Sequence, residues 1–425
     1  MQQKIGKWTS TSLVLGNMIG SGIFLLPASL AAYGGVSLLG WLVSAAGALL
    51  LAKVFASLSR MVPKSGGPYT YSRAGLGDFA GFLVAWGYWI SIWCTNAAIT
   101  VAMLGYLSVF FPILNEQPTV AVGLGLAIIW LLTWVNNRGI KNVGYVQLVT
   151  TILKIIPLIL VTIVGLFFVK MEHFAPFNLS GETNLTAIIQ TTTLTLFAFL
   201  GVESATIPAD NVDDAAATIP RATWIGVWVA IGVYILGSVA VMGVIPPDEL
   251  QHSAAPFADA ARVIFGDGAE YFVAAGAVIS TFGALNGWLL MQGQIPLAAA
   301  RDGIFPKFFA KLNRHDSPAA GIIFSSILAS ILMALNYAKG LNKAFEFMML
   351  LSTLTALVPY LFSSASYMIL SDKKELPVWK RRSTWIGLAA FTFAIFAVIG
   401  SGSEVVLWGF VMLMLGVPFY VFLKE

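Results

Sequence analysis

The stretch SLVLGNMIGSGIFLLPASLAAYGG, residues 12–35, places glycine and polar residues in the middle of an apolar run that is long enough to cross a bilayer. Asn17 is followed there by Gly20, Ser21 and Gly22. Backbone N–H and C=O groups that lose their helical partners at membrane depth cost several kcal/mol each, so they need other partners. The sequence therefore predicts a spanning helix that is interrupted at this point and whose freed backbone groups have partners outside the helix.

The composition is that of an integral membrane protein. Of the 425 residues, 58% are hydrophobic and 10% are charged, whereas soluble domains carry about 25% charged residues. A single cysteine, Cys94, excludes an internal disulfide framework. The net charge of +4 does not indicate a nucleic-acid partner, because the basic residues are scattered among the loops.

Long apolar runs predict an all-α integral membrane protein with twelve transmembrane helices. The runs are continuous, whereas the strands of a membrane barrel alternate between apolar and polar residues. The expected spans lie near residues 9–32, 38–61, 80–111, 119–136, 145–169, 184–209, 222–246, 269–300, 319–338, 343–370, 384–400 and 404–422.

Lysine and arginine residues predict how these spans are oriented. One set of loops, together with both chain ends, contains most of the basic residues, while the other set contains only Lys170, Arg262, Lys339 and Lys343. Because basic loops stay in the cytoplasm, both termini are expected to be cytoplasmic. The expected location is the plasma (inner) membrane, crossed many times.

A second interruption, FAFLGVESA at residues 197–205, lies in the sixth predicted span. The two interrupted spans are five helices apart, and an odd number of crossings inverts the topology. The sequence thus predicts a first repeat over residues 1–170, an inverted second repeat over 184–370, and two further helices over 384–422. Interruptions at matching places in two halves indicate a transporter whose binding site lies at the membrane midplane.

The two breaks offer opposite backbone groups. A break at Gly20–Gly22 exposes the N–H groups of Ser21, Gly22 and Ile23 at the positive end of a helix dipole, which suits a carboxylate. The break in the sixth span leaves carbonyls around Phe197 to Leu200, which suit an ammonium group. Together they would hold a zwitterion by its backbone. The alternative is that the glycines only allow close helix packing.

In these motifs the chain resembles the amino acid–polyamine–organocation (APC) superfamily, and within it the basic amino acid/polyamine antiporters, including the arginine/agmatine antiporter. The resemblance runs over nearly the whole chain and rests mainly on GNMIGSGIFLLPA (16–28) and TLFAFLGVESA (195–205), supported by SGGPYTYSRAGLGDFAGF (65–82) and AAARDGIFPKFFAKLN (298–313). It implies a LeuT-like fold with a 5+5 inverted repeat, alternating access, and exchange of one amino acid or amine for another.

The resemblance also implies roles for residues at matching positions, all in or beside the two breaks and the helices that face them. The implied substrate-binding residues are Asn17, Ser21 and Gly22 for the carboxylate, the carbonyls of Met18, Phe197 and Leu200 for the α-amino group, and Ser91, Ile92, Asn96 and Ser352 for the side chain. The implied gates are Phe197 and Trp288, with Tyr88, Glu203 and Tyr360 closing the cytoplasmic side.

Several of these assignments have a structural alternative. Asn96 could be an interhelical hydrogen-bonding residue instead of part of a mixed wall with Ser91 and Ile92. Phe197 stands where the arginine/agmatine antiporter has tryptophan, and an aromatic residue in a helix bundle is usually apolar filling. Beside a cavity, its ring can also attract a cation by about 0.5–2 kcal/mol. Glu203 is an acid at membrane depth, which marks a functional candidate, although it could also cap exposed N–H groups at the break.

Lys154 lies near the middle of the fifth span, too deep to reach the membrane surface. It is therefore expected to face the bundle and to donate to backbone carbonyls of the first span. The arginine/agmatine antiporter is apolar here, while other APC branches carry a lysine that bridges moving helices or takes a proton. Both roles remain open at this point, with helix coupling favoured.

The pattern favours a transporter over an enzyme. The three histidines fall in loops, and the sequence has no paired catalytic carboxylates or phosphate loop, so no catalytic residue, metal or cofactor is expected. The leading hypothesis is an exchanger of an amino acid against another amino acid or its amine. The alternatives are a proton-coupled symporter and, more distantly, an amino-acid-gated channel or a sensor. The expected partners are a small-molecule substrate and the lipid bilayer, with a homodimer left open.

Overall fold

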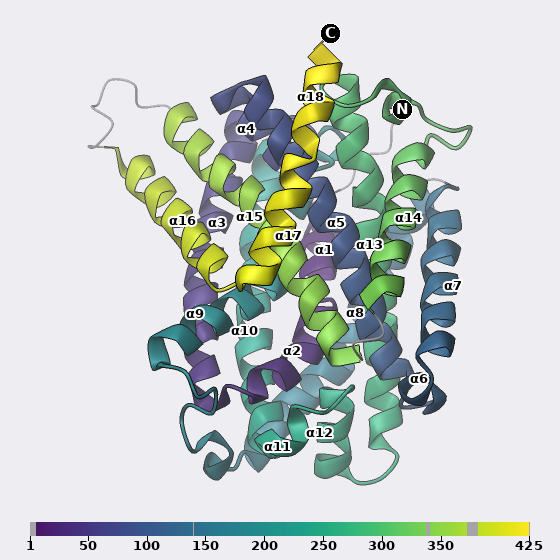
Figure 1. Ribbon diagram of the computed structural model, residues 1–425, viewed down its shortest axis with the longest axis vertical. Helices are drawn as coiled ribbons and strands as arrows, with labels where there is room; N and C mark the ends of the chain where they lie inside the picture. The colour runs from purple at the N-terminus through teal and green to yellow at the C-terminus, as the bar shows by residue number, and fades with distance from the viewer. Residues whose placement is uncertain (1–5, 139, 337–340, 372–380, 425) are drawn as a thin grey trace.

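The computed structural model describes residues 6–138, 140–336, 341–371 and 381–424, and within these ranges the chain is mostly helical, without a strand (Figure 1). The α-helices are α1 (Lys7–Met18), α2 (Ser21–Ala31), α3 (Ser37–Met61), α4 (Pro68–Leu76), α5 (Asp78–Leu107), α6 (Ile113–Glu116), α7 (Pro118–Asn136), α8 (Ile140–Gly165), α9 (Asn184–Leu196), α10 (Ala215–Val244), α11 (Pro247–Leu250), α12 (Pro256–Phe265), α13 (Ala269–Arg301), α14 (Ala319–Asn336), α15 (Leu341–Leu370), α16 (Arg382–Ile399), α17 (Ser403–Met414) and α18 (Gly416–Lys424). The 3-10 helices are η1 (Gly34–Val36), η2 (Leu166–Phe168), η3 (Met171–Phe174), η4 (Phe197–Phe199), η5 (Ser204–Thr206), η6 (Ala209–Asn211) and η7 (Lys307–Ala310).

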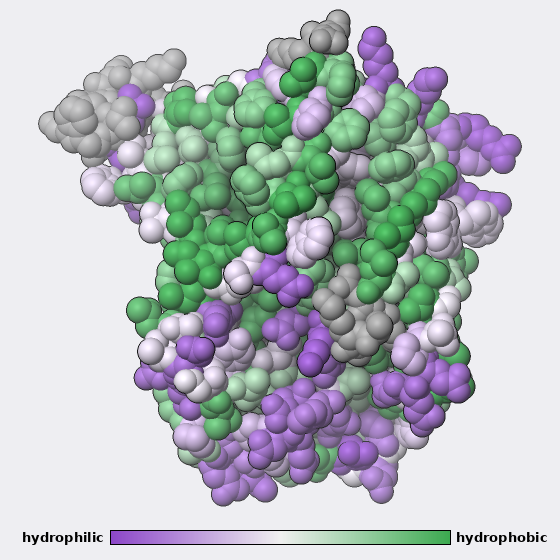
Figure 2. All heavy atoms as spheres, viewed as in Figure 1, coloured by the Kyte–Doolittle hydropathy of each residue, from purple (hydrophilic) through white to green (hydrophobic). Residues whose placement is uncertain are grey.

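Ten helical stretches in the described part of the chain are long and apolar enough to cross a membrane. The expected spans near 184–209 and 319–338 contain the shorter helices α9 and α14, and α9 is short because it stops at the second predicted interruption. Hydrophobic side chains form a broad band across the face in Figure 2, with hydrophilic ones gathered mainly at the lower end. The all-α, multi-span fold class is thus confirmed, while the count of twelve stays a prediction.

The core lies around α5, which carries charge only at its first residue, Asp78, and is buried along nearly its whole length. A helix that is apolar on every side belongs in the interior of a bundle. Helices α13 and α15 pack along it, and α8 packs against α13. Both chain termini lie at the same end of the bundle, at the top of Figure 1. The division into two inverted repeats stays a prediction.

Candidate functional site

The first break separates α1 from α2 by only two residues, Ile19 and Gly20. Ile19 still donates to the Leu15 carbonyl at 2.8 Å, but its ψ of 73° turns the chain out of the helix. The backbone N–H groups of Ser21, Gly22 and Ile23, which begin α2, have no acceptor among the described residues. These orphan donors at the start of a helix form an anion-binding end.

The second break is longer than the first. After α9 ends at Leu196, the chain makes the 3-10 turn η4 and then reaches Gly201, whose φ of +102° favours glycine. The Ala198 carbonyl accepts a hydrogen bond from the Tyr234 hydroxyl of α10 at 2.8 Å, and the Phe197 carbonyl accepts the N–H of Leu200 at 3.1 Å. The carbonyls expected to be free at this break are therefore partly engaged within the protein.

The two breaks pack directly on each other, and glycine makes this contact possible. A Cβ on Gly22 would lie 3.0 Å from the Cβ of Ala198, and a Cβ on Gly201 would lie 3.2 Å from that of Asn17. The Asn17 amide also donates to the Ser204 hydroxyl at 3.0 Å. Residues far apart in the sequence thus meet at the centre of the bundle, as the matched interruptions predicted.

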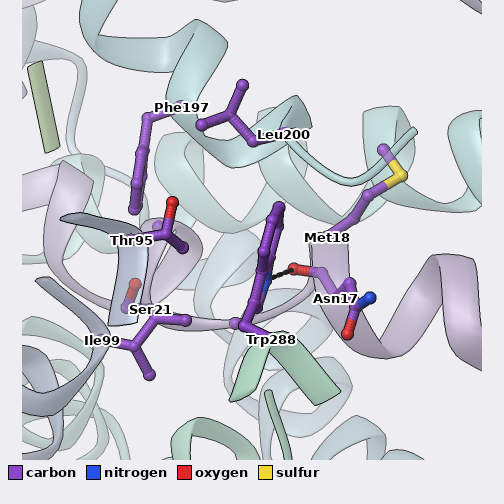
Figure 3. Close-up of a pocket in the computed structure, with 10 residues that line it drawn as sticks. Asn17, Met18, Ser21, Thr95, Ile99, Phe197, Leu200 and Trp288 are labelled. Atoms are coloured by element: carbon purple, nitrogen blue, oxygen red, sulfur yellow. Dashed lines mark hydrogen bonds between the residues drawn. The ribbon is translucent and has the colours of Figure 1, made fainter. Parts of the chain in front are cut away.

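A small cavity lies where the breaks meet (Figure 3). Its volume is about 10 Å³, room for roughly one water molecule, so side chains must move before an amino acid can enter. The Trp288 ring crosses the cavity and its Nε1–H donates to the Asn17 carbonyl at 3.2 Å. The lining residues are Asn17, Met18, Gly20, Ser21, Gly22, Thr95, Ile99, Phe197, Leu200 and Trp288.

Two side-chain oxygens at this cavity have no partner. The Ser21 hydroxyl and the Asn17 Oδ1 are buried, and neither finds a hydrogen bond within the described part of the chain. Buried polar atoms in a native structure are normally satisfied, so unpaired ones beside a cavity indicate a place for a polar ligand. A ligand there would meet the Ser21 side chain together with the orphan N–H groups.

The structure places the other expected binding residues behind this lining. Ile23 lies one residue past Gly22 in α2 and is fully buried, and Ile92 is buried in α5. The hydroxyls of Ser91 and Ser352 lie 3.3 Å apart, and Ser352 also lies 2.5 Å from the Thr95 hydroxyl. These two serines therefore position Thr95, which lines the cavity itself.

Asn96 belongs to a separate polar network. Its amide donates to Gln292 Oε1 at 2.7 Å, and the Gln292 amide donates onward to the Ser326 hydroxyl at 2.9 Å. The residues of α5 that reach the cavity are instead Thr95 and Ile99, which sequence reasoning did not single out. The signal was available, because Thr95 and Ile99 follow Ser91 at intervals of four and share its helix face, while Asn96 does not.

Glu203 is fully buried within the second break. The Tyr88 hydroxyl donates to its Oε1, and the Tyr360 hydroxyl donates to its Oε2 at 2.9 Å. The three residues predicted to close one side of the site thus form one cluster that joins α5, the second break and α15. A buried carboxyl group is costly unless it is hydrogen-bonded, and the two phenols meet that need.

Lys154 is 1% exposed and donates from Nζ to the Gly16 carbonyl at 3.0 Å and to the Ile19 carbonyl at 2.5 Å. The Ile19 carbonyl also accepts the Ser280 hydroxyl at 3.4 Å. The expected contact between this lysine and the carbonyls freed by the first break is therefore present. It ties α8 to the end of α1, whereas its role in transport stays a prediction.

Known proteins similar to this chain share its length and fold. The sequence profile of a family described as "Amino acid permease" matches residues 5–422. A "Putative arginine/ornithine antiporter" of Bacillus subtilis is 31% identical, covering 93% of this chain and 92% of the relative. A "Cadaverine/lysine antiporter" of Escherichia coli is 35% identical, covering 85% of this chain and 82% of the relative.

One solved structure, of an Eremococcus coleocola manganese transporter, is similar with a TM-score of 0.61 at 13% sequence identity. The match covers 98% of this chain and 93% of that one. At this identity the likeness concerns the fold alone, and it confirms the LeuT-like fold class.

Proposed function

The chain belongs to the amino acid permease family, and from that premise we propose that it exchanges a cationic amino acid for another amino acid or an amine by alternating access. The observation that carries the proposal is the cavity between the two breaks, where unpaired N–H groups at the start of α2 face aromatic rings. The orphan donors of Ser21 to Ile23 supply sites for the carboxylate, and the Ser21 hydroxyl adds a further donor.

The other end of the substrate meets carbonyls and aromatic faces. The carbonyls of Met18, Phe197 and Leu200 are the proposed acceptors for the α-amino group. The rings of Phe197 and Trp288, both lining the cavity, can attract a cationic side chain. The relatives described above carry names with lysine, cadaverine, arginine and ornithine, all of them cations, which supports this substrate class.

The small size of the cavity supports a gated exchanger over a channel. A channel needs a continuous polar path, whereas this cavity has room for about one water molecule. The proposed orientation puts both termini in the cytoplasm and the protein in the inner membrane, because the basic loops lie on that side. Self-association as a homodimer stays a prediction, to be tested by cross-linking in native membranes.

Counterflow in proteoliposomes tests the proposed exchange. Vesicles loaded with unlabelled lysine, arginine or leucine, or left empty, are supplied with labelled arginine outside. Exchange predicts rapid uptake into vesicles loaded with lysine or arginine, and little uptake into empty or leucine-loaded ones. A parallel series with an inward proton gradient and no internal amino acid tests proton-coupled symport.

Other outcomes of these flux measurements would indicate a different function or substrate class. Gradient-driven uptake into empty vesicles would replace exchange by proton-coupled symport, for which Lys154 and Glu203 are the candidate proton carriers. Steady ionic current would indicate a channel, and no flux with retained binding would indicate a sensor. Preferential counterflow with leucine would leave exchange intact and overturn the cationic substrate class.

A further inference from the structure

A second cavity lies away from the central one, at the ends of three helices. It has a volume of about 240 Å³ and is formed by Lys7 at the start of α1, Arg60 near the end of α3, and four residues in the first half of α10. We call it the basic cleft, and its lining residues are Lys7, Arg60, Pro220, Arg221, Trp224 and Ile225. None of its lining residues is among the substrate-binding or gating residues proposed above.

The three cationic side chains of the basic cleft are exposed and unpaired. None of Lys7, Arg60 and Arg221 makes an ion pair or a side-chain hydrogen bond with any described residue, and Lys7 only lies 5.2 Å from the ring of its neighbour Trp8. The acids nearest in sequence, Asp213 and Asp214, precede α10 and come within 4 Å of none of the three. Three like charges facing one cavity repel one another until an anion neutralises them.

The wall between these cations is apolar. Pro220, Trp224 and Ile225 lie close together along α10 and supply hydrophobic surface next to the basic groups. Trp8, the second residue of α1, is 70% exposed. Exposed tryptophans at the ends of spanning helices mark the membrane–water interface. The basic cleft therefore sits at the depth of lipid headgroups, with a cationic rim and an apolar wall.

We propose that the basic cleft binds an anionic phospholipid, with the headgroup phosphate between Lys7, Arg60 and Arg221 and an acyl chain against Trp224 and Ile225. Arginine guanidinium groups donate paired hydrogen bonds to phosphate, and basic pockets between membrane helices suit such headgroups. A soluble phosphate would use the cations but would leave the apolar wall without a function. The bound lipid bridges α1, α3 and α10, so it joins the first half of the interrupted helix to two neighbours.

Native mass spectrometry of the purified full-length protein tests this site. The protein is mixed with equal amounts of phosphatidylglycerol and phosphatidylcholine of the same acyl chains, and the retained lipid is quantified. The unmodified protein should retain phosphatidylglycerol in preference. Arg60→Gln with Arg221→Gln should reduce that preference by roughly tenfold or more, because each basic residue contributes separately to attraction of an anionic lipid.

A matched control removes the same charge elsewhere. Arg301→Gln with Lys311→Gln also deletes two exposed basic residues, at and after the end of α13, and neither lines the basic cleft. This variant should keep the phosphatidylglycerol preference. Equal loss in both double variants would assign the preference to net charge and overturn the site. Displacement of phosphatidylglycerol by millimolar inorganic phosphate would overturn the lipid assignment in favour of a soluble anion.

Discussion

The two helix breaks meet at one cavity, but they are built differently. The first takes only Ile19 and Gly20 before α-helix resumes, whereas the second runs from Phe197 to Asp214 through three 3-10 turns before α10 begins. At the first break the N–H groups and the Ser21 hydroxyl lack partners, while at the second the Ala198 carbonyl is bonded to Tyr234. The first break leaves polar groups without partners among the described residues, whereas the second bonds some of its groups within the protein.

This difference indicates which break should respond more strongly to substitution. Orphan donors are satisfied only when a ligand arrives, so changes at Ser21 or Gly22 should act on binding. Groups that already have partners contribute to folding, so changes at the second break should act on stability first. Substitutions matched between the two breaks can separate these effects.

The largest effect is expected for Gly22→Leu. A Cβ at Gly22 already meets Ala198 at 3.0–3.1 Å, so a leucine must push the breaks apart or fill the cavity. Overpacking of this kind costs typically 1–3 kcal/mol. Substrate binding and exchange should be lost, as measured by calorimetry and counterflow. Gly232→Leu is the control, since a Cβ there meets nothing within 4 Å. Unchanged substrate affinity in Gly22→Leu would contradict the assignment of the substrate site to the first break.

The next effect concerns Lys154, which ties α8 to the first break through two backbone carbonyls. Lys154→Met keeps the length of the side chain but removes two hydrogen bonds from a charged donor, each worth about 1.5–3 kcal/mol. Exchange should slow by at least tenfold, with only a modest change in affinity measured in one fixed state. A large loss of affinity without a change in turnover would contradict the coupling role.

The aromatic residues on the two sides of the cavity give a smaller effect. For a cationic substrate, Phe197→Trp should tighten binding and Phe197→Leu should weaken it, within the range of about 0.5–2 kcal/mol for a cation–aromatic contact. Trp288→Ala should reduce exchange more than binding, because the ring and its hydrogen bond to Asn17 close the cavity. The same affinity in all Phe197 variants would mean that no such contact is made there.

The smallest effect comes from a matched pair of serines, one in each break. Ser21→Ala removes an unpaired hydroxyl at the cavity and should weaken binding by about 0.5–1.5 kcal/mol without altering the melting temperature. Ser204→Ala removes the acceptor of the Asn17 amide and should lower the melting temperature instead. Thermal shift with and without substrate separates the two. The comparison between the breaks fails if both serines behave alike.

Much of this architecture follows from short-range features of the sequence. Glycine and polar residues within long apolar runs located both breaks, and the depth of Lys154 in its span predicted that it donates to the first one. The cluster of Glu203 with Tyr88 and Tyr360 came from the family resemblance and is present. These features depend on local spacing or on motifs, which a single sequence displays directly.

Other features depend on how helices rotate against one another, which spacing alone leaves open. Asn96 was expected at the substrate, yet it bonds Gln292 while Thr95, one residue earlier, lines the cavity. One residue turns a helix by about 100°, so residues adjacent in the sequence face different partners, and the substrate contact of Asn96 stays a prediction. The bond from Tyr234 to Ala198 was equally invisible, because it joins helices whose packing no motif specifies.

The ammonium of Lys154 also bears on which gradients the protein can use. Carbonyls at an unwound helix end are the usual ligands of a sodium ion in transporters with broken helices. Here the Gly16 and Ile19 carbonyls accept hydrogen bonds from the Lys154 amino group, which is covalently attached to the chain. A tethered amino group cannot cross the membrane with the substrate as a sodium ion does, so it cannot carry the energy of a sodium gradient into substrate movement. Flux should therefore be the same in sodium chloride and in choline chloride, and a sodium-stimulated rate would show that another ion site exists.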